Sequence, residues 1–493
     1  MSAIANGHSP MPSVAIVGAG FGGLGMAIQL KRAGFDDFTI YERGDSAGGV
    51  WRANTYPGAA CDVPSHLYSF SFAPAHHWSR RYAPQAEILA YLEGLVERFD
   101  LGSHLRLGTE VQRASFDRDA GRWSVETDGE AREFDLLVAA CGQLTTPAVP
   151  PLPGVEDVEG LTFHSATWDH DHDLSGRNVA VVGTGASAIQ FVPEIAPQVG
   201  RLTIYQRSAP WILPKPDREY ADWERSLFRA FPPRVGASRL GLWLFFEVSA
   251  HAFTAHRWIF KPYLARANRF RETELPDDPG LRALTTPDYE FGCKRVLFTS
   301  AWYETLRRDN IELVDGEVER VTPTGLVAAD GRERAADTII WGTGFRAQDF
   351  VAPLEVRGLE GRELNEVWES RPGAHLGMTV AGFPNLFLLY GPNTNHGSVS
   401  IPYMLECQFR YVLDAASRLR EGRLRYLDVR AEAQARWQRE IDERSPRTVW
   451  VEGGCESWYV DGEGHNTNNW VGAWREYRRR TERVDPADYA LVA

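Results

Sequence analysis

The sequence predicts an α/β protein with two Rossmann-like dinucleotide-binding domains and a helical insertion in the second. Residues 14–23 read VAIVGAGFGG and residues 179–188 read VAVVGTGASA, so an apolar run is followed twice by a GxGxxG/A turn. Each turn opens a helix-like stretch that leads to a further strand, at residues 38–43 and 202–207. A single glycine motif is a weak signal, whereas two in a strand–turn–helix–strand context are a strong one.

Further segments complete the two units. Three apolar runs that end in glycine, at residues 135–142, 337–344 and 385–391, are typical of additional strands. Residues 147–153 are rich in proline and suit a linker, and residues 401–420 have the pattern of one long helix. We therefore expect a discontinuous first domain formed by residues 1–150 and 385–493. The second domain is expected over residues 151–216 and 285–384, with the insertion at residues 217–284.

Composition and charge exclude several classes of protein. The 493 residues are 43% hydrophobic and 24% charged, as in an ordinary globular chain. The formal net charge of −13 makes nucleic acid an unsuitable partner. Residues 1–13 lack the basic and apolar regions of a signal peptide, so a cytoplasmic location is expected, as a monomer or small homo-oligomer.

The five cysteines form no recognisable pattern. Their number is odd and no two are close in the sequence, so we expect neither a disulfide framework nor a CxxC site, and a reducing cytoplasm fits. We also expect no metal site, because His76 and His77 have no companions with metal-ligand spacing.

The most apolar run of the chain is LGLWLFF at residues 240–246. It is too short to span a bilayer, so we expect no stable membrane span. A buried helix is the favoured interpretation, and a monotopic membrane contact is the alternative. We also expect the insertion to contribute to the substrate pocket, together with the loops near Tyr56 and Arg295.

The first glycine motif has the features of a site for FAD or NAD. Gly18 allows a tight turn, Gly20 allows a pyrophosphate to approach the backbone, and Gly23 allows close packing of helix on strand. The helix N-terminus offers free N–H groups to phosphate. Glu42 ends the next strand, where a carboxylate would accept both ribose hydroxyls. The alternative is a Rossmann scaffold with no ligand.

The second motif favours NADP. Gly183, Gly185 and Ala188 take the three glycine positions, but Gln206 stands where the carboxylate would be and Arg207 follows it. Loss of the acid removes repulsion toward a 2′-phosphate, and the guanidinium offers a planar fork to bind it. The alternative is that Arg207 is a solvated charge at the end of a strand.

Two such sites in one chain suggest that a hydride passes from NADPH to a flavin. A disulfide reductase would need a CxxC-type pair near the flavin, and the sequence has none. The sequence also lacks GxSxG, HExxH and P-loop motifs. Dioxygen or an external acceptor therefore remains as the oxidant.

Nearly the whole chain resembles the flavoprotein monooxygenases with two dinucleotide-binding domains, and most closely the type I Baeyer–Villiger monooxygenases. The linker after residue 157 carries Gly160, His164, Trp168 and Asp169, as in the family pattern FxGxxxHxxxW followed by Pro or Asp. Val158 stands where the family has Phe. Other segments that resemble the family are GGVW at 48–51, YPGAACD at 56–62 with Ala60 where many members have Arg, GCKRVLF at 292–298, GPNTN at 391–395 and SWY at 457–459.

The resemblance implies FAD and NADP(H) as cofactors, with FAD in the first domain and NADP in the second. The residues implied to bind them are Gly18, Gly20, Phe21, Gly23, Glu42, Gly49, Val50, Trp51, Tyr56, Asp62, Tyr68, Val111, Gly183, Thr184, Gly185, Ser187, Ala188, Gln190, Arg207, Ser208, Lys294, Arg295, Trp341 and Trp458.

The resemblance also implies the reaction. Reduced flavin would react with O₂ to give a C4a-peroxyflavin, which attacks a ketone to give an ester or lactone. Arg295 would keep its charge in a dry pocket and stabilise the oxyanion, and Asp62 would hold Arg295 in position. A structural Arg–Asp pair is the alternative for these two residues. The alternatives for the whole chain are an N- or S-oxygenating flavin monooxygenase and an NADPH-oxidising sensor without an organic substrate.

Overall fold

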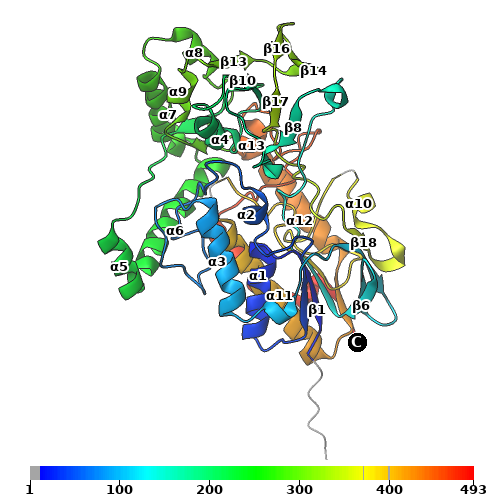
Figure 1. Ribbon diagram of the computed structural model, residues 1–493. Coiled ribbons are helices and arrows are strands. Elements are labelled where there is room, and N and C mark those ends of the chain that lie inside the picture. The colour runs from blue at the N-terminus through cyan, green and yellow to red at the C-terminus, as the bar shows by residue number, and fades with distance from the viewer. Residues whose placement is uncertain (1–10, 370, 398–399) are drawn as a thin grey trace, which may run out of the picture.

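The computed structural model describes residues 11–369, 371–397 and 400–493 and has two lobes, each built around a five-stranded parallel sheet (Figure 1). The expected absence of a signal peptide concerns residues 1–13, of which residues 1–10 lie outside this range. The second domain lies above the first in Figure 1, and the long helices of the insertion run along one side of the molecule. This architecture confirms the predicted fold class.

The first domain has the strand order β19-β7-β1-β2-β3. Its strands are β1 (Val14–Val17), β2 (Phe38–Tyr41), β3 (Leu105–Arg106), β7 (Leu136–Ala139) and β19 (Leu386–Leu388). Strand β1 lies in the middle of the sheet, with Val14 beside Phe38 on one side and Leu136 on the other. Because both faces of such a strand are buried, its sequence is apolar without alternation.

Helices cover one face of this sheet, and a second sheet covers the other. On one face lie α1 (Phe21–Arg32), α3 (Gln85–Arg98) and α11 (Ile401–Gly422), which pack on Ile16 and Val138. On the other face lies a sheet of β18 (Glu355–Arg357), β4 (Val111–Asp117), β5 (Arg122–Thr127) and β6 (Glu130–Phe134). The long helix predicted over residues 401–420 is confirmed.

The second domain repeats this plan with the strand order β13-β10-β9-β17-β8. Its strands are β8 (Leu161–His164), β9 (Asn178–Val182), β10 (Arg201–Gln206), β13 (Ile311–Asp315) and β17 (Thr338–Trp341). Helices α4 (Ala188–Ile195) and α9 (Trp302–Leu306) cover one face. The antiparallel strands β14 (Val318–Thr322), β15 (Gly325–Ala328) and β16 (Glu333–Ala335) cover the other.

The boundary between the domains differs from the prediction. Strand β18 pairs with β4, with Glu355 beside Arg113, and residues from Phe350 to Phe383 share the apolar cluster of the first domain. The chain therefore returns to the first domain near residue 350, not at residue 385. Sequence pattern misplaces this point because β18 is only three residues long.

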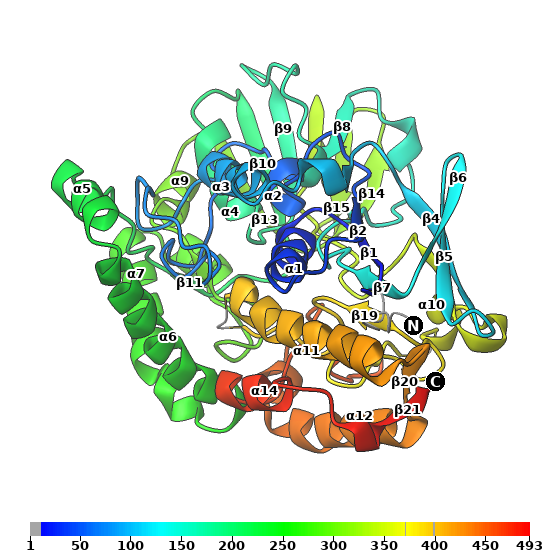
Figure 2. The same ribbon diagram turned by 90° about the horizontal axis from the view of Figure 1, so that it is seen from below.

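The C-terminal part completes the first domain beneath α1 and α11 (Figure 2). The remaining short elements of the two domains are α2 (Val50–Ala53), β11 (Ile212–Leu213), β12 (Leu297–Phe298), α10 (Leu364–Val367), β20 (Tyr426–Val429), α12 (Ala431–Arg444), α13 (Val449–Glu452), α14 (Trp474–Arg480) and β21 (Tyr489–Val492).

The insertion is helical, as predicted. It consists of α5 (Asp222–Ala230), α6 (Pro233–Thr254), η4 (Arg257–Phe260), α7 (Lys261–Glu274) and α8 (Pro279–Leu284). Residues 240–246 are helical, as predicted. The prediction that this helix is buried is wrong, because Leu240, Leu244 and Phe245 are each more than half exposed. No helix among the described residues is long and apolar enough to cross a bilayer.

Candidate active site at the junction of the two domains

A cavity of about 1260 Å³ has walls from both nucleotide domains. Its wall contains most of the residues predicted to bind cofactors. They are Gly18, Gly20, Phe21, Glu42, Gly49, Val50, Trp51, Tyr56, Asp62, Tyr68, Val111, Gly183, Thr184, Gly185, Ser187, Gln190, Arg207, Ser208, Lys294, Arg295 and Trp458. The structure therefore brings together segments that lie up to 440 residues apart in the sequence.

The first glycine turn brings bare backbone to the cavity wall. Gly18 has a φ of +104°, and a Cβ there would lie 2.5 Å from the Ala140 carbonyl oxygen. A Cβ on Gly49 would lie 2.9 Å from the Gly20 Cα, so two backbone segments meet where the cavity begins. A Cβ on Gly23 would lie 1.8 Å from the Gly18 oxygen, which confirms the predicted close packing of helix on strand.

The helices that follow both turns present uncapped N-termini to the cavity. Gly20 precedes α1 and Ser187 precedes α4, and neither position makes a side-chain capping hydrogen bond. The first turn of each helix contains no acidic residue. The free N–H groups and the positive end of the helix dipole thus suit an anionic group such as a pyrophosphate.

Glu42 lies in this wall at the end of β2. Its carboxylate accepts hydrogen bonds from the backbone N–H groups of Ala19, at 2.9 Å, and Gly44, at 2.8 Å, and the residue is buried. These bonds hold the side chain in one orientation. A carboxylate has about four lone-pair sites, so it retains acceptor capacity for a pair of hydroxyl groups.

The matching position in the second domain is occupied differently. Gln206 is fully buried, and its side-chain amide donates to the Leu284 carbonyl at 2.8 Å, away from the cavity wall. Arg207 lies in the wall and is mostly exposed, with only loose ion pairs to Glu317 at 3.7 Å and Glu456 at 3.9 Å. Its guanidinium is therefore accessible to a ligand.

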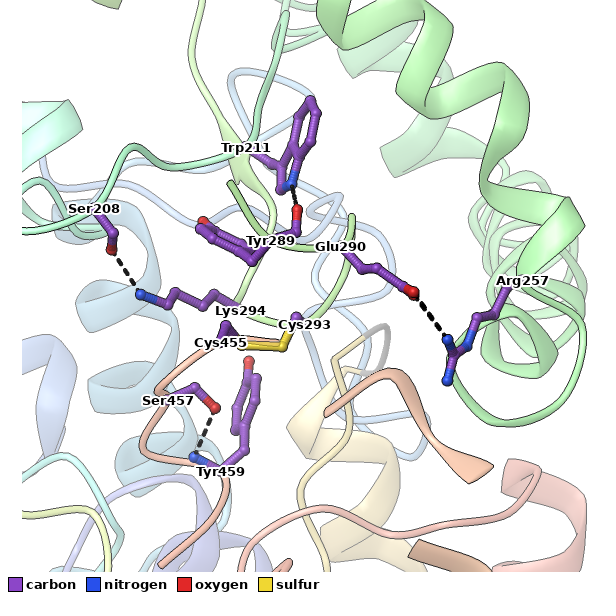
Figure 3. Close-up of a disulfide and its surroundings, with 10 residues drawn as sticks. All are labelled: Ser208, Trp211, Arg257, Tyr289, Glu290, Cys293, Lys294, Cys455, Ser457 and Tyr459. Carbon is purple, nitrogen blue, oxygen red and sulfur yellow. Dashed lines mark hydrogen bonds and ion pairs between the residues drawn. A yellow bond between two sulfur atoms is a disulfide. The ribbon is translucent and has the colours of Figure 1, made fainter. Parts of the chain in front are cut away.

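Lys294 stands in the same wall as Arg207. Its ammonium donates to the Ser208 hydroxyl at 2.6 Å and lies 4.9 Å from the centre of the Tyr289 ring (Figure 3). Burial lowers the pKa of Lys294, and the nearby positive charge of Arg207 lowers it further. Two cations that repel each other in a partly buried wall form a site that an anion would stabilise.

Arg295 and Asp62 form an ion pair on the cavity wall. The Arg295 Nε and Nη2 atoms both donate to Asp62 Oδ2, at 2.8 Å and 2.5 Å. Attraction by Asp62 raises the pKa of Arg295, so the guanidinium is permanently charged. Because the two bonds use two guanidinium nitrogens, they fix the plane of the group as well as its position.

The segment that carries Asp62 is attached to the second domain through Gln190 of α4. Tyr56 donates its hydroxyl proton to Gln190 Oε1 at 3.1 Å, and the Gln190 amide nitrogen donates to the Ala60 carbonyl at 3.0 Å. A Cβ on Gly58, which has a φ of +77°, would lie 2.8 Å from the Gln190 carbonyl oxygen. These contacts join the segment that carries Asp62 to the second domain.

An aromatic cluster forms another part of the wall. The Trp51 indole donates to the Tyr68 hydroxyl at 3.1 Å, and the Tyr68 ring lies 5.2 Å from Phe21 in an edge-on arrangement. These contacts orient three predicted cofactor-binding side chains from three separate segments.

A disulfide links two segments of the site, contrary to the prediction from the cysteine spacing. Cys293 and Cys455 are bonded across a sequence separation of 162 residues, so no local pattern could reveal them. Cys293 directly precedes Lys294, and Cys455 stands three residues before Trp458 (Figure 3). The bond therefore ties the Lys294–Arg295 segment to the C-terminal segment that closes the cavity.

Several residues in or beside the wall were not among the predicted cofactor-binding residues. Tyr390 donates to the Asn395 side chain at 2.9 Å within the loop that carries GPNTN, and both residues line the cavity. Tyr289 lies beside Lys294, and Tyr459 lies beside Arg295. The sequence signals for this group are the GPNTN motif and the SWY segment that contains Tyr459, whereas Tyr289 and Tyr390 reach the site through tertiary packing.

Other predicted residues lie elsewhere. Gly23, Ala188 and Trp341 do not belong to the described wall, and the Trp341 indole donates to the Thr162 hydroxyl at 2.6 Å between neighbouring strands. Within the described part of the chain no residue of the insertion, 217–284, lines the cavity. The expectation that the insertion contributes to this pocket is therefore wrong.

The linker motif is part of the second domain. A Cβ on Gly160 would lie 2.5 Å from the Asp337 carbonyl oxygen, and the Trp168 ring packs against Phe163 and Phe191. His164 is buried, and its Nδ1 accepts from the Ala166 N–H at 3.1 Å, while Asp169 stays near the surface. These residues hold edge strand β8 in place and do not line the cavity.

Comparison with known proteins shows the family. Residues 15–223 match the family model described as pyridine nucleotide-disulphide oxidoreductase. The chain is 46% identical over 482 residues to a Baeyer–Villiger monooxygenase of Streptomyces coelicolor, an alignment that covers 97% of this chain and 92% of that protein. It is 44% identical over 481 residues to one of Pseudomonas aeruginosa, covering 97% and 91%. The chain belongs to the Baeyer–Villiger monooxygenase family.

Solved structures agree with this assignment. An oxidized steroid monooxygenase bound to NADP is similar with a TM-score of 0.85 and 31% identity, covering 98% of this chain and 99% of the other. Cyclohexanone monooxygenase from Rhodococcus sp. Phi1 bound to NADP⁺ is similar with a TM-score of 0.85 and 28% identity, covering 98% and 100%. The predicted family, fold class and enzyme class are thus confirmed for this Baeyer–Villiger monooxygenase family member.

Proposed function

We propose that this protein is an FAD- and NADPH-dependent Baeyer–Villiger monooxygenase, which inserts one oxygen atom from O₂ next to a ketone carbonyl to give an ester or lactone. The observation that carries the proposal is the shared cavity, where two uncapped helix N-termini and the Arg295–Asp62 pair meet. Bound FAD and NADPH supply hydride transfer, reduction of O₂ and delivery of one oxygen atom.

The residues of the first domain fit FAD. Gly20 and Gly49 have no side chains and lie side by side in the cavity wall, so a phosphate chain can approach the bare backbone there. The N-terminus of α1 faces the same part of the cavity. Glu42 would accept the two ribose hydroxyls of the adenosine. A complex with FAD and NADP has been described for another structurally similar protein, OTEMO, at 26% identity and a TM-score of 0.85.

The residues of the second domain fit NADP. The pyrophosphate would lie at the N-terminus of α4, and the 2′-phosphate would lie between Arg207 and Lys294. The loose ion pairs of Arg207 and the mutual repulsion of the two cations support this position, because a bound phosphate relieves both. The buried amide of Gln206 brings no negative charge to oppose the phosphate.

The roles of Arg295 and Asp62 follow from their geometry. Arg295 keeps its positive charge and presents it to the cavity, where it would stabilise negative charge on the reacting oxygen atoms and on the carbonyl oxygen. Asp62 orients the guanidinium through Oδ2. The partly buried Tyr390 and the buried Tyr459 stand near Arg295.

We also propose that the enzyme works in the cytoplasm, where NADPH is supplied, as a monomer or small homo-oligomer acting on a small-molecule ketone. The test is to measure NADPH oxidation with a panel of ketones under ¹⁸O₂ and to identify the products by mass spectrometry. An ester or lactone with one labelled oxygen supports the proposal. Stoichiometric H₂O₂ without any ester indicates an NADPH-oxidising sensor, and labelled sulfoxides or N-oxides without esters indicate heteroatom oxygenation.

A further inference from the structure

The outer face of helix α6 is apolar. Leu240, Leu244, Phe245 and Val248 are each more than half exposed. Their spacing of four, five and eight residues from Leu240 places them on one side of a helix. Single exposed apolar residues are ordinary on a protein surface, but a row of four on one helix indicates an interaction surface.

More large apolar side chains lie in the segments that flank α6. Trp223 in α5, Phe231 between α5 and α6, and Trp258 in η4 are also more than half exposed. Together with the four residues of α6 they make up seven of the ten exposed large hydrophobic residues in the described chain. Tryptophan is the side chain most suited to a boundary between water and an apolar phase, because its ring is apolar and its N–H is polar.

The same segment is strongly basic in an acidic protein. Residues 222–271, from the start of α5, contain nine Arg and Lys and three acids, Asp222, Glu224 and Glu247, whereas the whole chain has a net charge of −13. Glu247 is buried and accepts from the backbone N–H groups of Trp474, at 3.1 Å, and Arg475, at 3.4 Å. Glu247 therefore faces the protein interior, and the other two acids are paired, Glu224 with Arg218 and Asp222 with Arg225.

Several of these cations have no ionic partner. Five of the nine are exposed and form no ion pair within the described part of the chain, namely Arg229, Arg234, Lys261, Arg266 and Arg269. Arg234 also lies in the wall of a cavity of about 380 Å³ between α5 and α6, together with Arg81 and Arg218. Glu224 in that wall is already paired with Arg218.

The scaffold holds α6 firmly while its outer face stays free. Arg239 donates to the carbonyl oxygens of His66, at 2.6 Å, and Ser69, at 3.0 Å, and Val235, Ala250 and Phe253 are buried on the inner side. The helices of the insertion run along one edge of the molecule (Figure 2). None of these residues lines the active-site cavity.

We propose that this face, defined by Leu240, Leu244, Phe245 and Val248 with its flanking tryptophans and basic residues, binds the surface of an anionic lipid bilayer. An apolar helix face with Trp at its margins and Arg or Lys around it lies in the plane of the membrane interface without crossing it. A second copy of the chain fits less well, since a symmetric contact would bring the same basic segments together.

Vesicle flotation tests the proposal. The full-length wild type should float with vesicles of equimolar phosphatidylcholine and phosphatidylglycerol and remain in solution with pure phosphatidylcholine. The double variant Leu244→Glu/Phe245→Glu should lose association by about tenfold or more, because it removes apolar burial and adds charge of the same sign as the lipid. Leu107→Glu/Leu491→Glu, at exposed leucines elsewhere, is the matched control and should float like the wild type.

Charge variants test the electrostatic part. Arg229→Gln/Arg234→Gln should weaken binding about fivefold per side chain, the equivalent of about 1 kcal/mol for a basic residue near an anionic surface. Arg118→Gln/Arg332→Gln, at exposed arginines outside the insertion, should have little effect. Circular dichroism and the thermal midpoint check that every variant is folded.

The outcomes of these experiments distinguish a lipid bilayer from a second copy of the chain as the partner of the α6 face. Failure of the wild type to float, or equal flotation of the wild type and Leu244→Glu/Phe245→Glu, overturns the proposal. A wild-type dimer in sedimentation velocity that the same variant dissociates, with no vesicle binding, assigns the face to a second copy instead. Oxidation of a water-soluble ketone measures the proposed function separately, because these substitutions lie outside the active-site cavity.

Discussion

Replacement of Arg295 by Ala should separate oxygen transfer from NADPH oxidation. The guanidinium is held by two hydrogen bonds to Asp62 Oδ2, and its charge faces the cavity. Loss of one preorganised group that stabilises a developing oxyanion costs about 10²–10³ in rate, or about 2.7–4 kcal/mol. We therefore expect ester formation to fall at least about a hundredfold, with NADPH oxidation continuing and its electrons appearing as H₂O₂.

Two further variants show whether charge or geometry matters. Arg295→Lys keeps the charge but cannot make the two-pronged contact with Asp62, so it should recover only part of the ester yield. Asp62→Asn keeps the charge of Arg295 and weakens its orientation, so its defect should be smaller than that of Arg295→Ala. The partial exposure of this ion pair limits the loss of folding stability in each variant.

The assay measures NADPH consumption, O₂ consumption, H₂O₂ and ester in the same reaction. Equal ester yield per NADPH in Arg295→Ala and the wild type would refute the role of Arg295. A variant that no longer oxidises NADPH at all would show that Arg295 acts in cofactor binding before oxygen transfer.

Three other predictions address the second nucleotide site, the disulfide and His66, which packs against the insertion at Ser238 and Phe228. Arg207→Ala should raise the KM for NADPH about tenfold or more and leave NADH unaffected, since it removes a charged contact to the 2′-phosphate; an equal effect on both nucleotides would contradict this, and exposed Arg177→Ala is the control. Cys455→Ser should raise the KM for NADPH several-fold by releasing the segment that carries Trp458. A dithiol should do the same to the wild type but not to the variant, because the variant has no Cys293–Cys455 bond to reduce. Burial lowers the pKa of His66 from 6.5 to about 4, so the stability it contributes is complete above pH 6.5 and is lost as the pH falls toward 4, by about 3 kcal/mol in all; pH-dependent denaturation of the wild type and His66→Asn would show no such difference if His66 were solvated.

The local sequence was sufficient to predict the two nucleotide domains. A parallel strand buried on both faces needs an unbroken apolar run, and the turn after it needs Gly18 and Gly183 because both have a positive φ. These requirements act within about ten residues, so VAIVGAGFGG and VAVVGTGASA show them directly. The difference between Glu42 and Gln206 could be read in the same way, because each position is set by its own strand.

The tertiary structure alone decided the features that depend on distant contacts. The Cys293–Cys455 disulfide, the pairing of the three-residue strand β18 with β4 and the tyrosines near Arg295 join segments that are far apart in the chain. The exposure of Leu244 and Phe245 was equally hidden, since an apolar run has the same sequence whether protein or solvent lies beside it. Local pattern determines what a segment forms, whereas the packing of the whole chain determines what that segment meets.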